Sequence, residues 1–64
     1  MTLAAAKRFV LLTLQSTGRA AEPALLAEAT NLPIDDVVWV LDCLRDEERV
    51  RCRVVHGREW WEAV

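Results

Sequence analysis

Arginines recur at short intervals near the end of this 64-residue chain. The stretch RVRCRVVHGR, residues 49–58, contains four arginines, one histidine and no acidic residue. Arginine is well suited to neutralise the phosphates of nucleic acids. We therefore expect a nucleic-acid contact made by Arg49, Arg51, Arg53, His56 and Arg58. The alternative is a solvated strand face on which the arginines pair with Glu59 and Glu62.

A second candidate site surrounds a tryptophan in the middle of the chain. Trp39 is framed by Asp35, Asp36 and Asp42 on the outer side of an expected helix. A tryptophan ringed by carboxylates suits a protein partner that carries basic groups around an apolar pocket. We expect Trp60, which should face outward from the last strand, to belong to the same partner-binding set.

No arrangement of residues predicts catalysis, a cofactor or a metal site. The sequence lacks a glycine-rich phosphate loop, a serine elbow and metal-ligand spacing, and its only histidine falls in an expected turn. Cys43 and Cys52 form no CxxC pair, so we expect two reduced, inert thiols in a cytoplasmic protein. The apolar run from Phe9 to Leu14 is too short for a membrane span. We therefore expect a binding protein that is not an enzyme and has no small-molecule substrate or membrane contact.

The net charge of −2 conceals a separation of charge along the chain. Residues 1–21 contain three basic side chains and no acid, whereas residues 22–48 contain eight acids against a single arginine. Residues 49–58 are basic again. Such a separation predicts a two-sided electrostatic field whose basic side attracts phosphate or acidic protein.

The order of local signals predicts a single α+β domain, mostly helical, over residues 1–64. Thr2 is a suitable N-cap, and Gly18 and Asn31 suit the left-handed conformation that often ends a helix. Pro23 and Pro33 fit the first turns of the next two helices. We expect helices over about residues 2–17, 23–30 and 34–47, followed by strands over about 49–55 and 59–64.

Apolar periodicity indicates which faces of these elements are buried. The third helix carries an apolar stripe at helical spacing, formed by Val37, Val40, Leu41 and Leu44. In the expected hairpin, apolar residues alternate with arginines, and His56-Gly57 is the turn. We expect Trp61 to point inward and Trp60 outward.

The first helix has more apolar surface than one small core needs. Its expected core face consists of Leu3, Lys7, Val10, Leu11 and Leu14. A second stripe contains Ala5, Phe9 and Leu12. These three residues either fill the edge of the core or form the seam of a homodimer.

The whole pattern resembles the winged-helix superfamily, in particular small domains of the bacterial or phage type. The most specific stretch is LLAEATNLPIDDVVWVLDCLRDEERV, which is similar to a winged helix-turn-helix in its apolar positions and its Asn-Leu-Pro corner. The resemblance implies three helices and a C-terminal two-stranded β-hairpin, the wing. It also implies that base edges are read from the second helix of the motif, at Ile34, Asp35, Val38, Trp39 and Asp42.

These reading positions depart from the superfamily pattern, because two are apolar and two are acidic. Two narrower resemblances also depart from their families. The ending Arg58-Glu59-Trp60-Trp61 resembles FeoC-type regulators of iron transport, but their wing cysteine cluster is reduced here to Cys52. The layout is similar to Z-DNA-binding domains, but their contact asparagine and tyrosine fall on Val38 and Asp42.

Two functions follow from these observations. The first is a DNA-binding transcriptional regulator that contacts the phosphates of double-stranded DNA through the arginines of its wing. The alternative is a protein-interaction domain that uses the acidic helix face around Trp39. The two functions use opposite faces and are compatible with one another.

Overall fold

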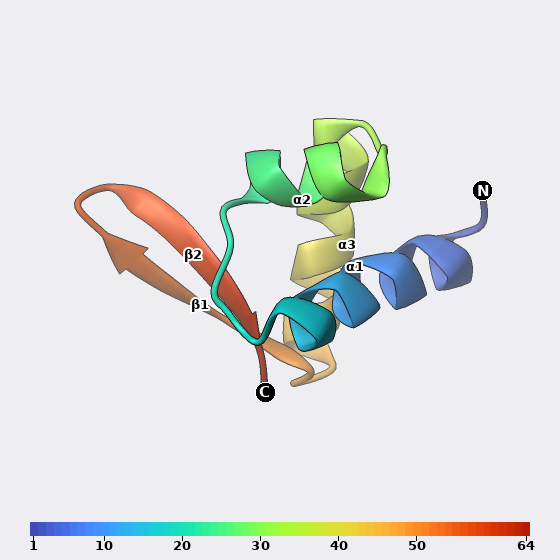
Figure 1. Ribbon diagram of the computed structural model, residues 1–64. Coiled ribbons are helices and arrows are strands. Elements are labelled where there is room, and N and C mark those ends of the chain that lie inside the picture. Colours follow the sequence, from blue (N-terminus) through green and yellow to red (C-terminus); the bar gives the residue numbers. More distant parts are fainter.

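Three helices precede a two-stranded hairpin in the computed structural model, which describes residues 1–64 (Figure 1). The elements are α1 (Leu3–Thr17), α2 (Pro23–Thr30), α3 (Ile34–Asp46), β1 (Val50–Val55) and β2 (Arg58–Ala63). The α3 helix ends one residue before the expected position, because Glu48 adopts a left-handed conformation (φ 60°) and the Arg49 N–H then bonds back to the Leu44 carbonyl. The strands begin one residue later and one residue earlier than expected.

Local capping sets the bounds of α1. The Thr2 hydroxyl accepts a hydrogen bond from the Ala5 N–H at 3.1 Å, and Gly18 closes the other end at φ 63°. The buried stripe of the helix is Ala6, Val10 and Leu14. The expectation of a core face that includes Leu3 and Lys7 was therefore wrong. The face is rotated toward Ala6, with Leu3 exposed.

The corner between α2 and α3 has the geometry that its residues predict. Asn31 ends α2 in the left-handed region at φ 59°. The Pro33 carbonyl then accepts hydrogen bonds from the Asp36 and Val37 N–H groups, which starts α3. The apolar stripe of α3 is fully buried, as expected, and it consists of Val37, Val40, Leu41 and Leu44.

The hairpin is closed by a two-residue turn. His56 (φ 53°) and Gly57 (φ 77°) are both left-handed, as type I′ turns require. A third chain segment pairs with this hairpin: Ala21 exchanges two backbone hydrogen bonds of 2.8 Å with Trp61. No strand was expected between α1 and α2, so this bridge is a feature that the sequence did not predict.

Trp61 joins the hairpin to the helices, as its expected inward orientation requires. Its side chain is only 3% exposed, and its indole N–H donates to Glu59 at 3.2 Å. The Arg45 guanidinium of α3 lies over the ring, 5.5 Å from the centroid. The position of Trp61 therefore fixes the wing relative to α3.

Candidate nucleic-acid and protein interfaces

The strand register collects basic side chains on one face of the hairpin. Cross-strand pairs place Arg51 opposite Glu62, Arg53 opposite Trp60, and Val55 opposite Arg58. Because side chains alternate between the two faces of a strand, these pairs share one face. We name Arg51, Arg53 and Arg58 the arginine face. Trp60 is half-buried there.

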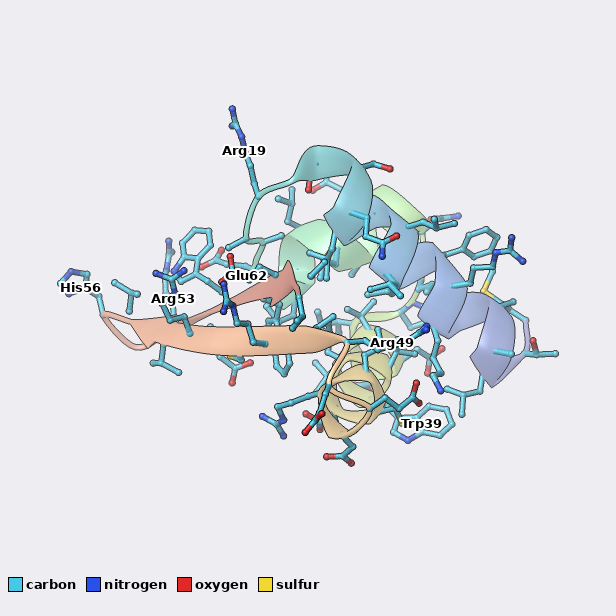
Figure 2. The ribbon with its side chains drawn as sticks, turned by 90° about the horizontal axis from the view of Figure 1, so that it is seen from below. Arg19, Trp39, Arg49, Arg53, His56 and Glu62 are labelled. Carbon is cyan, nitrogen blue, oxygen red and sulfur yellow. The ribbon has the colours of Figure 1, made fainter.

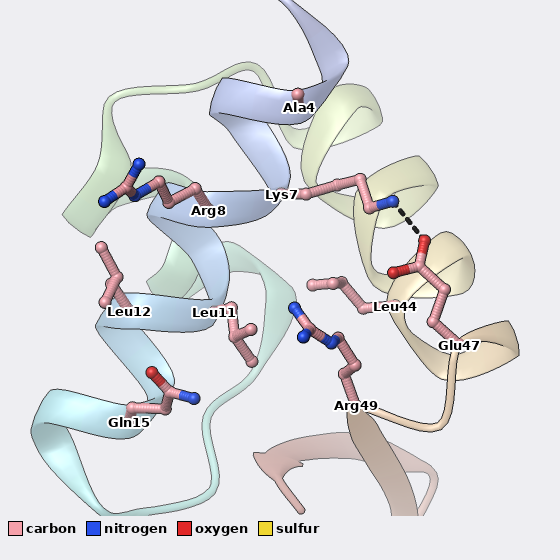
Figure 3. Close-up of a pocket in the computed structure, with 9 residues that line it drawn as sticks. All are labelled: Ala4, Lys7, Arg8, Leu11, Leu12, Gln15, Leu44, Glu47 and Arg49. Carbon is pink, nitrogen blue, oxygen red and sulfur yellow. Dashed lines mark hydrogen bonds and ion pairs between the residues drawn. The ribbon is translucent and has the colours of Figure 1, made fainter.

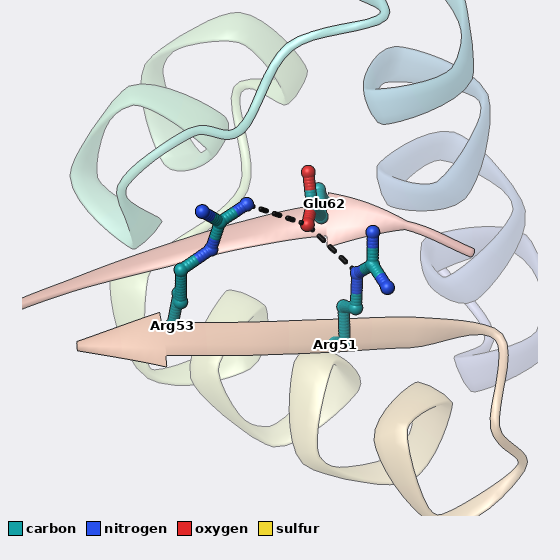
Figure 4. A network of polar contacts seen from close by, with 3 residues as sticks. All are labelled: Arg51, Arg53 and Glu62. Carbon is teal, nitrogen blue, oxygen red and sulfur yellow. Dashed lines mark hydrogen bonds and ion pairs between the residues drawn. The ribbon is translucent and has the colours of Figure 1, made fainter.

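Glu62 holds two of these arginines in place (Figure 4). Its Oε1 accepts hydrogen bonds from Arg51 Nε at 2.7 Å and from Arg53 at 3.1 Å. These two bonds lower the pKa of the Glu62 carboxyl below its ordinary value. Both arginine side chains remain about 70% exposed. Each guanidinium has five N–H donors, so donors remain for a phosphate.

The expected pairing with Glu62 is therefore present, but the pairing with Glu59 is not. Glu59 lies on the other face of the hairpin and accepts the Trp61 indole N–H. Arg58 instead pairs with Glu22 at 3.4 Å, across the segment that precedes α2. The arginine face is thus only partly neutralised.

The structure does not bring all five predicted nucleic-acid residues into one cluster. Arg51, Arg53 and Arg58 share a face, and His56 lies at the exposed tip of the turn (Figure 2). Arg49 precedes β1, and its side chain lies beside α1 instead (Figure 3). Arg49 lies one residue before β1, where its N–H donates to the Leu44 carbonyl of α3 at 2.9 Å and its carbonyl accepts from the Val64 N–H at 3.0 Å.

Arg19 is a candidate that the sequence analysis did not assign to this site. Its side chain is exposed, makes no ion pair, and projects to the same side of the hairpin as Arg53 (Figure 2). Arg19 also lines a shallow pocket together with Glu62. The signal available in the sequence was the basic segment 1–21, whose last residues lie beside β2 through the bridge between Ala21 and Trp61.

The outer side of α3 has the opposite character. Trp39 is 55% exposed, and Ile34 and Val38 are each 45% exposed. All the α3 acids are exposed, and only Asp42 has an ion-pair partner, Arg45, at 3.2 Å. We name Asp35, Asp36, Trp39, Asp42 and Asp46 the acidic surface. Trp60, expected to join this partner-binding set, lies on the hairpin beside Arg53 and is not part of it.

A third surface lies on α1. Phe9 and Leu12, two of the three expected dimer residues, are each 47% exposed, and Ala5 is half-buried. The expectation that they merely fill the core edge is therefore wrong for Phe9 and Leu12. A cleft of about 370 Å³, which Leu12 also lines, lies between α1 and the end of α3 with the connection that follows it (Figure 3).

The arginine face and the acidic surface point to different sides of the molecule. In Figure 2, Arg53 and Glu62 project from one side of the hairpin, whereas Trp39 lies on the other side of the molecule, beyond α3. A single flat partner therefore does not contact both. No three His, Cys, Asp or Glu side chains form a group that could hold a metal ion. None of the three helices has the length and apolarity needed to cross a membrane.

Comparison with known proteins supports the fold assignment. No family model and no curated protein matches the sequence. A solved structure of HOP2, from work on its DNA recognition and protein interaction domains and its homologous DNA pairing properties, is similar to this chain. The two share 22% identity at a TM-score of 0.80, over 92% of this chain and 98% of that chain. The protein therefore has the winged-helix fold, while the FeoC-type resemblance stays a prediction.

Proposed function

We propose that this protein binds double-stranded DNA through phosphate contacts and acts as a small regulator of transcription. The observation that carries the proposal is the set of exposed guanidinium groups on one side of the molecule. Arg51, Arg53 and Arg58 share the arginine face, and Arg19 projects to the same side of the molecule as Arg53. HOP2, whose winged helix this chain resembles, is described as having DNA recognition domains.

The proposed contact differs from the common docking mode of the fold. In that mode the second helix of the motif enters the major groove, and the wing contacts the neighbouring backbone. Here Asp35 and Asp46 on α3 have no ion-pair partner and would face a polyanion. We therefore propose that DNA approaches the arginine face, on the side away from the acidic surface.

The test is fluorescence anisotropy with a labelled random-sequence duplex, titrated from low to physiological salt. The Arg51→Ala/Arg53→Ala variant should reduce the slope of log affinity against log salt by about 2, one for each lost phosphate contact. The matched control is Arg8→Ala/Arg49→Ala, which removes the same charge elsewhere and should change the slope less. DNA binding that does not depend on salt, or an equal reduction of the slope in the two variants, would contradict the proposal.

A second function is favoured by a specific observation on α3. Trp39 is more than half exposed and stands among carboxylates, most of which have no partner. An exposed tryptophan is a common anchor of protein interfaces, and the surrounding charges select basic partners. We propose that the acidic surface docks a protein segment carrying cations around an apolar centre.

A synthetic amphipathic helix of leucine and lysine provides a probe for this docking surface. The labelled peptide should bind the wild-type protein, and Trp39→Ala should abolish binding while leaving the circular dichroism spectrum unchanged. Phe9→Ala is the control, since Phe9 is a similarly exposed aromatic residue on α1. If the Trp39→Ala and wild-type proteins bind the peptide equally, Trp39 is not the anchor and the proposal is wrong.

A further inference from the structure

The cleft beside α1 combines apolar walls with unused positive charge. Its apolar lining comes from Leu11, Leu12 and Leu44, and its basic lining from Lys7, Arg8 and Arg49. Lys7 pairs with Glu47 at the edge nearest α3 (Figure 3). The side chains of Arg8 and Arg49 make no hydrogen bond or ion pair. The cleft therefore suits an occupant that presents an apolar group flanked by carboxylates.

The acidic surface of the same chain has this chemistry. Trp39 provides the apolar group, and Asp35 and Asp46 lie on the same outer side of α3 without partners. At about 370 Å³, the cleft is within the range of about 300 to 1,000 Å³ that is typical of ligand pockets. The two surfaces are thus complementary in both polarity and charge.

We propose that copies of this protein associate head to tail, with Trp39 of one copy seated in the α1 cleft of the next. Asp35 and Asp46 then face Arg8 and Arg49 of the neighbouring copy. This inference rests on the second proposed function and identifies its partner as the chain itself. Because the two contacting surfaces differ, each added copy leaves one of each kind free, and the assembly grows as an open chain.

Charge also disfavours the symmetric dimer that the α1 stripe suggested. Ala5, Phe9 and Arg8 line one shallow pocket, so a symmetric contact there brings two copies of Arg8 together. Residues 1–21 contain no acid that could neutralise them. A symmetric contact between two acidic surfaces is opposed in the same way. The head-to-tail contact pairs opposite charges instead.

Sedimentation velocity on the full chain tests the proposal with two variants. The first, Asp35→Asn/Trp39→Ala/Asp46→Asn, removes the docking surface and leaves the cleft intact. The second, Arg8→Ala/Arg49→Ala, alters the cleft and leaves the docking surface intact. The wild-type sedimentation coefficient should increase with protein concentration at low salt, whereas each variant alone should remain monomeric.

The decisive sample is the mixture of the two variants. One functional cleft and one functional docking surface remain, so the mixture should form dimers of twice the monomer mass and nothing larger. Raising the ionic strength from about 0.02 M to about 0.5 M should dissociate them, because exposed charges are then screened within a few ångströms. The control Glu28→Gln changes an exposed acid of α2 outside both surfaces and should associate like the wild type.

Three results would overturn the proposal. They are a wild-type protein that stays monomeric at every concentration, variants that each still dimerise, and a mixture that remains monomeric. Dimerisation by both variants would instead indicate the symmetric contact through Phe9 and Leu12. Binding of the leucine-lysine peptide through Trp39 by a monomeric wild-type protein would preserve the docking function while refuting self-association.

Discussion

The acidic surface of α3 and the arginine face of the hairpin are both exposed, but they differ in how far their charged side chains are paired within the chain. Arg51 and Arg53 share the single carboxylate of Glu62, and Arg58 pairs with Glu22, so the charge of the arginine face is only partly neutralised within the chain. On α3, Asp35, Asp36 and Asp46 have no partner. The difference shows that a winged helix can place its net positive charge away from the helix that usually reads DNA.

The two regions also differ in how they depend on the core. The outer residues of α3 make little contact with the core, because its buried stripe lies on the opposite side of the helix. The arginine face, in contrast, is built on both strands of the hairpin, and Trp61 of β2 is almost fully buried on the other face. Substitutions on α3 should therefore change binding alone, whereas substitutions behind the arginine face should change folding as well.

Replacing the buried tryptophan should produce the largest effect on stability. Trp61→Ala removes a side chain that contacts Arg45 and the core, and should cost about 3–5 kcal/mol of unfolding free energy. Trp39→Ala should change it by no more than about 0.5 kcal/mol, as is usual for exposed sites. Urea denaturation of both variants measures the difference. Equal losses of unfolding free energy would mean that the outer side of α3 is also packed against other residues.

Much of the fold followed from the sequence because its signals are local. The Thr2 cap, the left-handed Gly18 and Asn31, and the Gly57 turn each depend on neighbours within a few residues. The stripe of α3 was predicted for the same reason, since helical spacing is fixed. Local chemistry therefore sets where each element begins and ends.

The site was harder to predict because it depends on residues that are distant in the sequence. Ala21 carries no strand signal, and only its two hydrogen bonds to Trp61 reveal the bridge. Arg49 was grouped with Arg51, but its N–H bonds the Leu44 carbonyl at 2.9 Å and keeps it in the turn after α3. Arg49 and Arg51 are two residues apart in the sequence, yet Arg49 lines the cleft beside α1 whereas Arg51 bonds Glu62.

Neutralising one acid in each region and measuring DNA affinity should show which of the two surfaces lies nearer the DNA. Glu62→Gln removes a negative charge from among the arginines and should raise DNA affinity a few-fold at low salt, because the carboxylate repels the phosphates. Asp46→Asn removes the same charge from α3 and should raise it less, because that surface faces away. Anisotropy titrations compare the two. A larger gain from Asp46→Asn would place DNA on α3.

The smallest expected effect is a pH dependence that belongs to the arginine face alone. Hydrogen bonds from Arg51 and Arg53 hold the pKa of Glu62 below its ordinary value of about 4.5. The pKa of Glu62 is therefore lower in the folded protein than in the unfolded chain. The ion pairs of Glu62 contribute fully to stability above the unfolded pKa, and this contribution is lost as the pH falls through the folded pKa. The difference in unfolding free energy between wild type and Glu62→Gln should shrink as the pH is lowered from about 6 to about 3.

Chemical denaturation at each pH measures this difference, with Glu28→Gln as a control without an ion pair. A constant difference would mean that the two arginines do not hold Glu62 in solution, and would leave their guanidinium groups equally available to DNA at every pH.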